Sequence, residues 1–232
     1  MCGRFTIAIA AGFFDRFQVA KESSPLLESH FNITPAQEIP VIISTEGGNH
    51  VVVLMTWGLV PAWASDRHTG HHPINARAEN LTEKPMFSGL VEDRRCLIPA
   101  NGFFEWKKTG TTKIPSYIHR KDDALFAFAG LYDVWKREQP PLCSCTIVTT
   151  TPNLVVAPLH DRMPAILRRD DESVWLEKKR LDRVTLSRIL SPYPAEELES
   201  YRISRLVNDT SIDSVEVIAR VGDKPLFTGE QT

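Results

Sequence analysis

Residues 125–135 read LFAFAGLYDVW and decide the fold. Apolar side chains occupy both sets of alternating positions, and Asp133 is the only charged residue. This pattern is typical of a strand that is buried on both faces. Residues 118–119 precede it across the polar segment 121–123, so the two runs predict a hairpin whose second strand lies centrally in a mainly β core.

Further strands and helices are predicted on both sides of this segment. β-branched residues fill 40–45 and 50–57, and the intervening Gly47-Gly48 predicts a hairpin. Apolar spacing predicts a short helix over 13–20 and surface helices within 170–190. Additional strands are expected at 103–106, 143–151, 165–167, 203–207 and 215–218. A helical turn is expected over 153–159, residues 223–232 read as a polar tail, and no linker or repeat divides the chain.

Composition limits the classes of function. The 232 residues are 42% hydrophobic, and 27 basic against 29 acidic side chains give a net charge of −2. This balance excludes a general coating of nucleic acid, so any such binding must use a local cluster. The sequence contains neither an apolar run of membrane-spanning length nor the pattern of a secretory signal. We therefore expect a cytoplasmic monomer without membrane contact, nucleoid-associated when bound to DNA, or nuclear in a eukaryote.

Cysteines and histidines do not predict a metal or disulfide framework. The cysteines contain no CxxC spacing, and three histidines fall in a polar loop without regular ligand spacing. We expect reduced thiols, buried packing for the pair on the strand at 143–151, no metal and no cofactor. The residues concerned are Cys2, Cys96, Cys143, Cys145, His68, His71 and His72.

The first residues could support a specific reaction with aldehydes. Removal of Met1 would give Cys2 a free α-amine and a thiol on adjacent carbons. An α-amine has a pKa of about 8, against about 10.4 for a lysine, so more of it is nucleophilic at neutral pH. The amine can condense with an aldehyde, and the thiol can then close a thiazolidine ring. The alternative is that Cys2 is simply a small residue near the start of the chain.

Two later segments combine polar groups in unusual ways. In an extended segment Asn75, Arg77 and Glu79 would point to the same side. On the strand at 103–106, Glu105 shares a face with Phe103, so burial should raise its pKa. An imidazole, a carboxylate and a guanidinium are consecutive in the apparent loop 160–162.

Taken together, the motifs resemble those of the SRAP family, the SOS-response-associated peptidases. The resemblance covers residues 2 to about 218. It rests on Cys2-Gly3-Arg4, 31–35 (FNITP), Trp57-Gly58, 75–77 (NAR), 96–106 and 160–164 (HDRMP). It implies an α+β fold: one SRAP-type domain over 1–232, with a mainly antiparallel, barrel-like β core and flanking helices.

The resemblance also implies a function. A positively charged cleft would take single-stranded DNA, and Cys2 would form a protective covalent crosslink with an abasic site. By motif match the catalytic set is Cys2, Asn75, Glu105 and His160, and the DNA contacts include Arg4, Arg77 and Arg162. Peptidase activity would amount to removal of Met1, and a Schiff-base intermediate would permit lyase activity. Trp57 and Trp63, which flank an irregular turn expected to be exposed, fit either base stacking or core packing.

Other interpretations of these residues remain open. Glu105 could be a salt-bridged structural residue, His160 a core histidine, and the arginines part of a solvated face. Class II glutamine amidotransferases also begin with a Met-Cys-Gly sequence, in which the cysteine attacks an amide, although their further glycine-rich motifs are absent here. A non-catalytic reader of modified DNA is the third interpretation.

Overall fold

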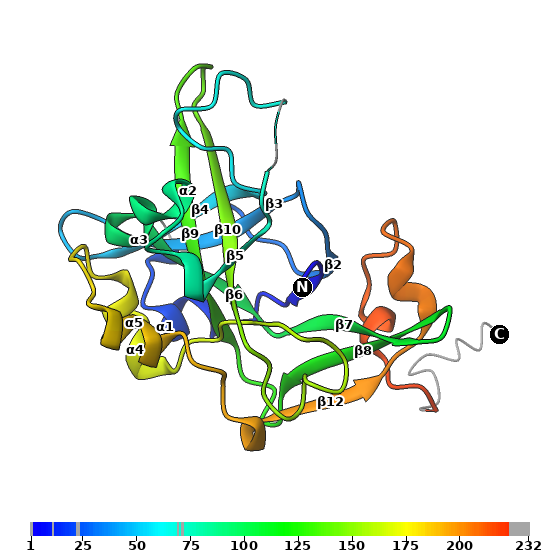
Figure 1. Ribbon diagram of the computed structural model, residues 1–232. Helices are drawn as coiled ribbons and strands as arrows, with labels where there is room; N and C mark the ends of the chain where they lie inside the picture. Colours follow the sequence, from blue (N-terminus) through cyan, green and yellow to red (C-terminus); the bar gives the residue numbers. More distant parts are fainter. Residues whose placement is uncertain (1, 11, 22–23, 69, 71, 223–232) are drawn as a thin grey trace.

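The structure is a computed structural model that describes residues 2–10, 12–21, 24–68, 70 and 72–222. Its strands divide between two sheets (Figure 1). The predicted tail at 223–232, as well as Met1 and His71, lies outside the described residues. In chain order the strands are β1 (Phe5–Ile7), β2 (His30–Ile33), β3 (Glu38–Ser44), β4 (His50–Trp57), β5 (Asn75–Arg77), β6 (Arg95–Ala100), β7 (Gly102–Thr109), β8 (Thr112–Arg120), β9 (Phe126–Trp135), β10 (Leu142–Thr150), β11 (Met163–Pro164) and β12 (Leu198–Arg202).

The larger sheet closes into a five-stranded barrel. Its order is β10-β4-β3-β6-β9, and β9 pairs again with β10. All of these pairings are antiparallel except β10 with β4, which is parallel. The short strands β5 and β11 both pair with β10 beyond the ring. The α+β class and the mainly antiparallel, barrel-like core are therefore confirmed.

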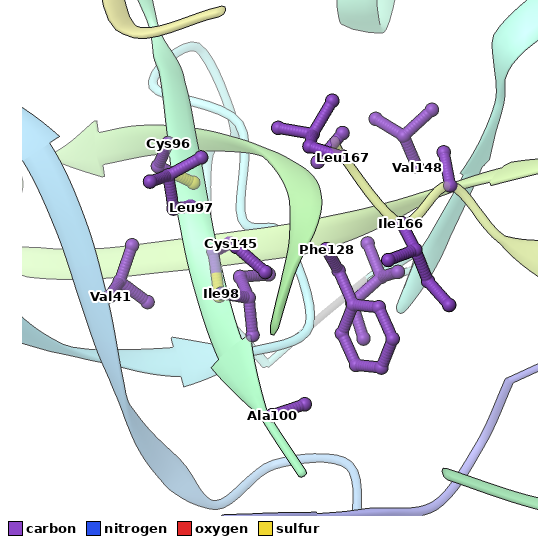
Figure 2. Close-up of a cluster of buried hydrophobic side chains, with 14 of the residues drawn as sticks. Val41, Cys96, Leu97, Ile98, Ala100, Phe128, Cys145, Val148, Ile166 and Leu167 are labelled. Atoms are coloured by element: carbon purple, nitrogen blue, oxygen red, sulfur yellow. The ribbon is translucent and has the colours of Figure 1, made fainter. Parts of the chain in front are cut away.

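Apolar side chains fill the barrel. Figure 2 shows Phe128 of β9 among aliphatic residues from β6, β10 and the segment after β11. At Gly130 a methyl group would lie 2.8 Å from the Cys96 sulfur, so only glycine permits β6 and β9 to approach this closely. The segment 125–135 is the central strand that its sequence predicted, with nearly every residue buried.

The second sheet has the order β12-β8-β7-β1-β2 and lies beside the barrel (Figure 1). Phe5 of β1 joins the two layers, because its ring packs at 5.2 Å from that of Trp57 and 5.7 Å from that of Phe128. Edge-to-face contacts of this kind are favourable beyond the area that they bury. They fix β1, and with it the residues just before Phe5, against the barrel.

Helices are few and short. Helix α1 confirms the predicted helix after the first strand, and α4 and α5 confirm those within 170–190, on one flank of the barrel (Figure 1). The turn predicted at 153–159 is also present, through bonds such as that from the amide of Ala157 to the carbonyl of Asn153. The α-helices are α1 (Phe13–Phe17), α2 (Pro85–Ser88), α3 (Leu90–Asp93), α4 (Arg169–Leu176) and α5 (Arg183–Ile189), and the 3₁₀ helices include η2 (Ala78–Asn80), η3 (Ala195–Glu197), η4 (Arg205–Asn208) and η5 (Val215–Ile218).

One prediction of strand pairing and one prediction of two closing strands are wrong. β8 and β9 do not form a hairpin: β8 pairs with β7 and β12 in one sheet, while β9 pairs with β6 and β10 in the other. The segments 203–207 and 215–218 are not closing strands, since η4 and η5 occupy most of them. Both pack Val207 and Val217 into a small second core on the outer face of β7 and β8. The predicted hairpin of β3 and β4 is confirmed.

Candidate active site

The first described residues run along β7. Phe5 is in register with Phe103, and the carbonyl of Arg4 accepts a hydrogen bond of 3.0 Å from the amide of Phe104. Continuing this antiparallel register brings Gly3 opposite Glu105. Cys2 is fully buried, with its thiol 3.8 Å from the carbonyl of Arg4.

Asn75 holds Cys2 from the barrel side. β5 lies parallel to β10, with Asn75 in register with Ile147, and this pairing directs the Asn75 amide nitrogen to the carbonyl of Cys2 at 2.9 Å. The Asn75 side-chain oxygen is buried and has no hydrogen-bond partner within the described part of the chain. A buried polar atom without a partner is costly, so this oxygen is suited to accept a hydrogen bond from a ligand.

Glu105 lies in the predicted apolar surroundings. Its side chain is on the same face of β7 as Phe103 and is buried. Burial raises the pKa of Glu105 above its ordinary 4.5, while the nearby positive charge of His160 acts in the opposite direction. Burial also raises the pKa of the Cys2 thiol, and the charge of Glu105 raises it further. The predicted direction for Glu105 is therefore confirmed, and the two groups are close enough to influence each other.

His160 lies close enough to Glu105 to influence its pKa. The turn at 153–159 ends in a bond from the amide of His160 to the carbonyl of Val156. The Nδ1 atom of His160 accepts a hydrogen bond of 3.0 Å from the Arg162 amide, and it lies 2.9 Å from the Asp161 carboxylate. His160 and Glu105 both line a cleft of about 640 Å³. The structure thus brings the four predicted catalytic residues together.

Arg4 lines the same cleft. Its guanidinium donates to the side-chain oxygen of Asn32 at 2.6 Å and to the carbonyl of Val207 at 2.5 Å. It also lies 5.7 Å from the centre of the Trp106 ring. These contacts hold the guanidinium at the wall of the cleft, beside Trp106.

The other two predicted DNA contacts differ in exposure. Arg77 is exposed at the end of β5, next to Asn75. Arg162 is buried, forms a bidentate ion pair with Glu79 at 2.7 and 3.0 Å, and donates to the carbonyl of Thr149. Its guanidinium therefore braces the loop that carries His160. Glu79 also departs from the prediction, because the extended segment ends at Arg77 and Glu79 lies in η2.

Comparison with known proteins assigns the family. The family model described as SOS response associated peptidase (SRAP) matches residues 1–210. The chain belongs to the SRAP family. This assignment confirms the resemblance noted in the sequence.

Several SRAP relatives have curated names. The abasic site processing protein YoaM of Bacillus subtilis is 43% identical over 94% of this chain and 97% of its own length. The abasic site processing protein HMCES of Xenopus tropicalis is 28% identical over 82% of this chain and 66% of its own length. A crystal structure of a Bacteroides thetaiotaomicron protein superimposes with a TM-score of 0.81, at 26% identity, over 94% of this chain and 99% of its own.

The two tryptophans considered for base stacking lie outside the SRAP cleft. Trp57 is fully buried, and its indole nitrogen donates to the carbonyl of Ile74 at 2.9 Å. It therefore packs in the core and has no free face for a base. Trp63 is 68% exposed but is not among the residues that line the cleft. The turn between them is irregular but only partly exposed, because Leu59 and Val60 are buried.

Sequence reasoning missed five residues that line the SRAP cleft: Trp106, Lys108, Lys113, Leu159 and Asn208. Trp106 and Lys108 are two positions apart on β7 and share the face opposite to Glu105, a period-two pattern that the sequence already contains. Lys113 and Asn208 become neighbours only through the pairing of β8 and the placement of η4. No helix in the described ranges is long and apolar enough to cross a membrane, and no group of potential metal ligands occurs there.

Proposed function

We propose that this protein processes abasic sites in single-stranded DNA. After removal of Met1, the amine and thiol of Cys2 form a thiazolidine crosslink with the aldehyde of the lesion and so shield it. The SRAP relatives that are named abasic site processing proteins support this activity. The crosslink itself is supported by the surroundings of Cys2.

The observation that carries the proposal is the contact between Asn75 and Cys2. A hydrogen bond of 2.9 Å from the Asn75 amide fixes the main chain of Cys2, from which both the amine and the thiol branch. The side-chain oxygen of Asn75 is buried and accepts no hydrogen bond from a described residue, so it is open to a ligand. Once the DNA is bound, a Cys2 held in this way meets the aldehyde of the lesion at the high effective concentration of an intramolecular step.

The reaction balances without an oxidant or a metal. In its open form the abasic sugar carries an aldehyde at C1′. The amine of Cys2 adds to this carbon, and loss of the aldehyde oxygen as water leaves a C=N bond. The thiol then adds to the same carbon, and its proton passes to the nitrogen as the ring closes. One water molecule is released for each crosslink.

The environment of Cys2 sets the order of these steps. Burial, with the charge of Glu105 added, raises the pKa of the Cys2 thiol. The sulfur therefore remains protonated while the amine attacks. It becomes the nucleophile only when Glu105, or the nitrogen of the C=N bond, accepts its proton. The amine acts first and the thiol second.

Glu105 and His160 divide the transfer of protons. The raised pKa of Glu105 brings a carboxyl group closer to neutral pH, where it can exchange protons with the amine and the thiol beside it. His160 lines the same cleft and can protonate the ring oxygen when the sugar opens. The buried oxygen of Asn75 can accept a hydrogen bond from the carbinolamine.

The DNA contacts of the proposal are Arg4 and Arg77. Since the net charge is −2, affinity must come from cations that folding gathers in one place. Arg4 lines the cleft and Arg77 is exposed beside Asn75, so both are suited to phosphate binding. Arg162, which is committed to Glu79, contributes by holding the His160 loop.

Intact-mass spectrometry tests this function. The processed protein is mixed with a single-stranded oligonucleotide that contains one abasic site. We expect a heat-stable adduct whose mass equals protein plus oligonucleotide minus one water. Release of ammonia from glutamine without an adduct would instead support an amidohydrolase, and DNA binding without an adduct would support a reader.

A tagged chain provides the matched control. A non-cleavable extension before Cys2 converts its amine to an amide, which cannot form a C=N bond with an aldehyde. We expect this protein to bind the DNA but not to form the adduct. An equal yield of adduct from tagged and processed protein would show that the Cys2 amine is not the nucleophile.

A further inference from the structure

The cleft continues from Glu105 toward the hairpin that joins β7 and β8. Lys108 and Lys113 line this part of the cleft, together with Trp106 and Asn208. The two lysines are directly opposite each other in the β7–β8 register, and both are exposed. Because alternate residues of a strand share a face, Lys108 lies on the same side of β7 as Trp106.

This pair of lysines is unfavourable for the folded protein alone. Like charges directly opposite each other on an antiparallel pair are destabilising. Within the described ranges, the ion pairs include neither lysine. Among the described residues, Glu105 is the only carboxylate that lines the cleft, and it lies on the other face of β7 from Lys108. The repulsion therefore has no acidic partner in the described part of the protein.

An anion bound between the lysines would relieve this repulsion. Lys108 is three positions beyond Glu105 on β7, which corresponds to about 10 Å along a strand. The cleft, which both residues line, connects the two faces of the strand. If a nucleic-acid strand enters the cleft at Glu105, a phosphate one or two nucleotides further along the strand would reach Lys108. Lysine ammonium groups act as point charges and attract a phosphate without reading the base.

We propose that Lys108 and Lys113 form a phosphate clamp that holds the DNA strand on one side of the abasic nucleotide. This inference rests on the proposed function, because it takes the lesion to lie beside Cys2. It adds a direction to the bound DNA: the strand leaves the reactive residues along the β7–β8 hairpin. The clamp contributes affinity and orientation and takes no part in the bond-forming steps.

Fluorescence anisotropy across a salt series tests the clamp. The protein is the double variant Lys108→Gln/Lys113→Gln, and the probe is single-stranded DNA with a reduced abasic analogue that has no aldehyde. The matched control is Lys107→Gln/Lys121→Gln, which removes two positive charges outside the set that lines the cleft. Loss of two phosphate contacts should make the slope of log affinity against log salt shallower by about 1.4 in the first variant only.

Shortened probes locate the clamp. One probe ends just 5′ of the lesion analogue and the other just 3′ of it. The difference between the lysine variant and the parent protein should disappear with one of these probes and persist with the other. Equal slopes for the parent protein and the lysine variant, or equal changes in the lysine and control variants, would overturn the clamp. So would a difference that persists with both shortened probes.

The two proposals fail separately. Because the anisotropy probe cannot react, the clamp is judged by binding alone. The crosslink is judged by intact mass, with the parent protein and reactive DNA. Absence of the adduct would refute the proposed function even where the clamp binds, and a normal adduct with unchanged salt slopes would refute only the clamp.

Discussion

Arg4 and Asn32 are joined by a hydrogen bond of 2.6 Å from the guanidinium to the side-chain oxygen of Asn32. The side-chain nitrogen of Asn32 donates in turn to the carbonyls of Asp209 at 3.0 Å and Ile212 at 2.8 Å. Asn32 is therefore a buried junction between the segment that carries Cys2 and the 3₁₀ helices near the end of the described chain.

Asn32→Ala should weaken this junction. The substitution removes a donor to the carbonyls of Asp209 and Ile212 and one of the two acceptors of the Arg4 guanidinium. This loss should lower the free energy of unfolding by about 1–3 kcal/mol. Crosslinking should also slow, since Arg4 would lose one of its fixed contacts. Urea unfolding measures the first effect and a timed denaturing gel the second. Asn208→Ala, which removes an exposed partner of Trp106, is the control and should cost less stability.

Replacing the thiol separates the two steps of the proposed reaction. Cys2→Ala keeps the α-amine after removal of Met1, so a C=N bond with the lesion should still form and be trapped by borohydride. The stable adduct should be lost, because no sulfur remains to close the ring. Cys2→Ser should give at most a weaker oxygen analogue. A heat-stable adduct from Cys2→Ala at the parental yield would contradict the thiazolidine product.

Removing the carboxyl group tests proton transfer. Glu105→Gln should slow adduct formation by about 10²- to 10⁴-fold, the usual contribution of a general acid or base, while DNA affinity changes little. His160→Ala should also slow the reaction but alter its dependence on pH differently, because it removes a different proton carrier. Rate–pH curves identical to that of the parent protein for both variants would return the two residues to structural roles.

Glu105 should also affect stability in a pH-dependent way. Burial raises the pKa of Glu105 above 4.5, so the folded protein keeps this proton at pH values where the unfolded chain has lost it. Its contribution to the free energy of unfolding is therefore fully present below about pH 4.5 and is lost as pH rises through the folded-state pKa. Glu105→Gln should gain stability relative to the parent protein over this interval. Urea unfolding at several pH values checks the sign, and a constant difference would contradict it.

Substitutions of Arg77 and Arg162 should have different effects on DNA binding and stability, although both residues were predicted to contact DNA. Arg77→Ala removes an exposed cation and should make the salt dependence of DNA binding shallower by about 0.7, with stability unchanged. Arg162→Ala leaves the carbonyl of Thr149 without its buried donor and should cost about 1–3 kcal/mol of stability. Anisotropy and urea unfolding on both variants test this contrast. Equal losses of stability would contradict the structural difference between them.

Local patterns predicted much of the fold. The hairpin of β3 and β4 followed from β-branched runs around adjacent glycines, and the central strand β9 followed from its apolar character. The pairing of β8 could not be read in this way. Its true partner β7 is joined through 109–112 (TGTT), a turn with a weaker sequence pattern than the acidic segment after β8. Partner choice is settled by packing of the two sheets, which single segments do not encode.

The candidate site shows the same division. Glu105 could be placed in an apolar environment because alternation along one strand suffices for that inference. The burial of Trp57 and Arg162 could not be predicted, because tryptophan and arginine occur both inside proteins and on DNA-binding surfaces. Apolar runs as short as Leu206-Val207 and Val217-Ile218 cannot separate a strand from a 3₁₀ turn. Only the contact with the outer face of β7 and β8 decides between them.

The bond from Arg4 to the carbonyl of Val207 spans 203 positions of the sequence. During synthesis the ribosome therefore makes Arg4 long before the carbonyl that holds its guanidinium. The wall of the cleft at Arg4 is complete only after Val207 and Asn208 have been made.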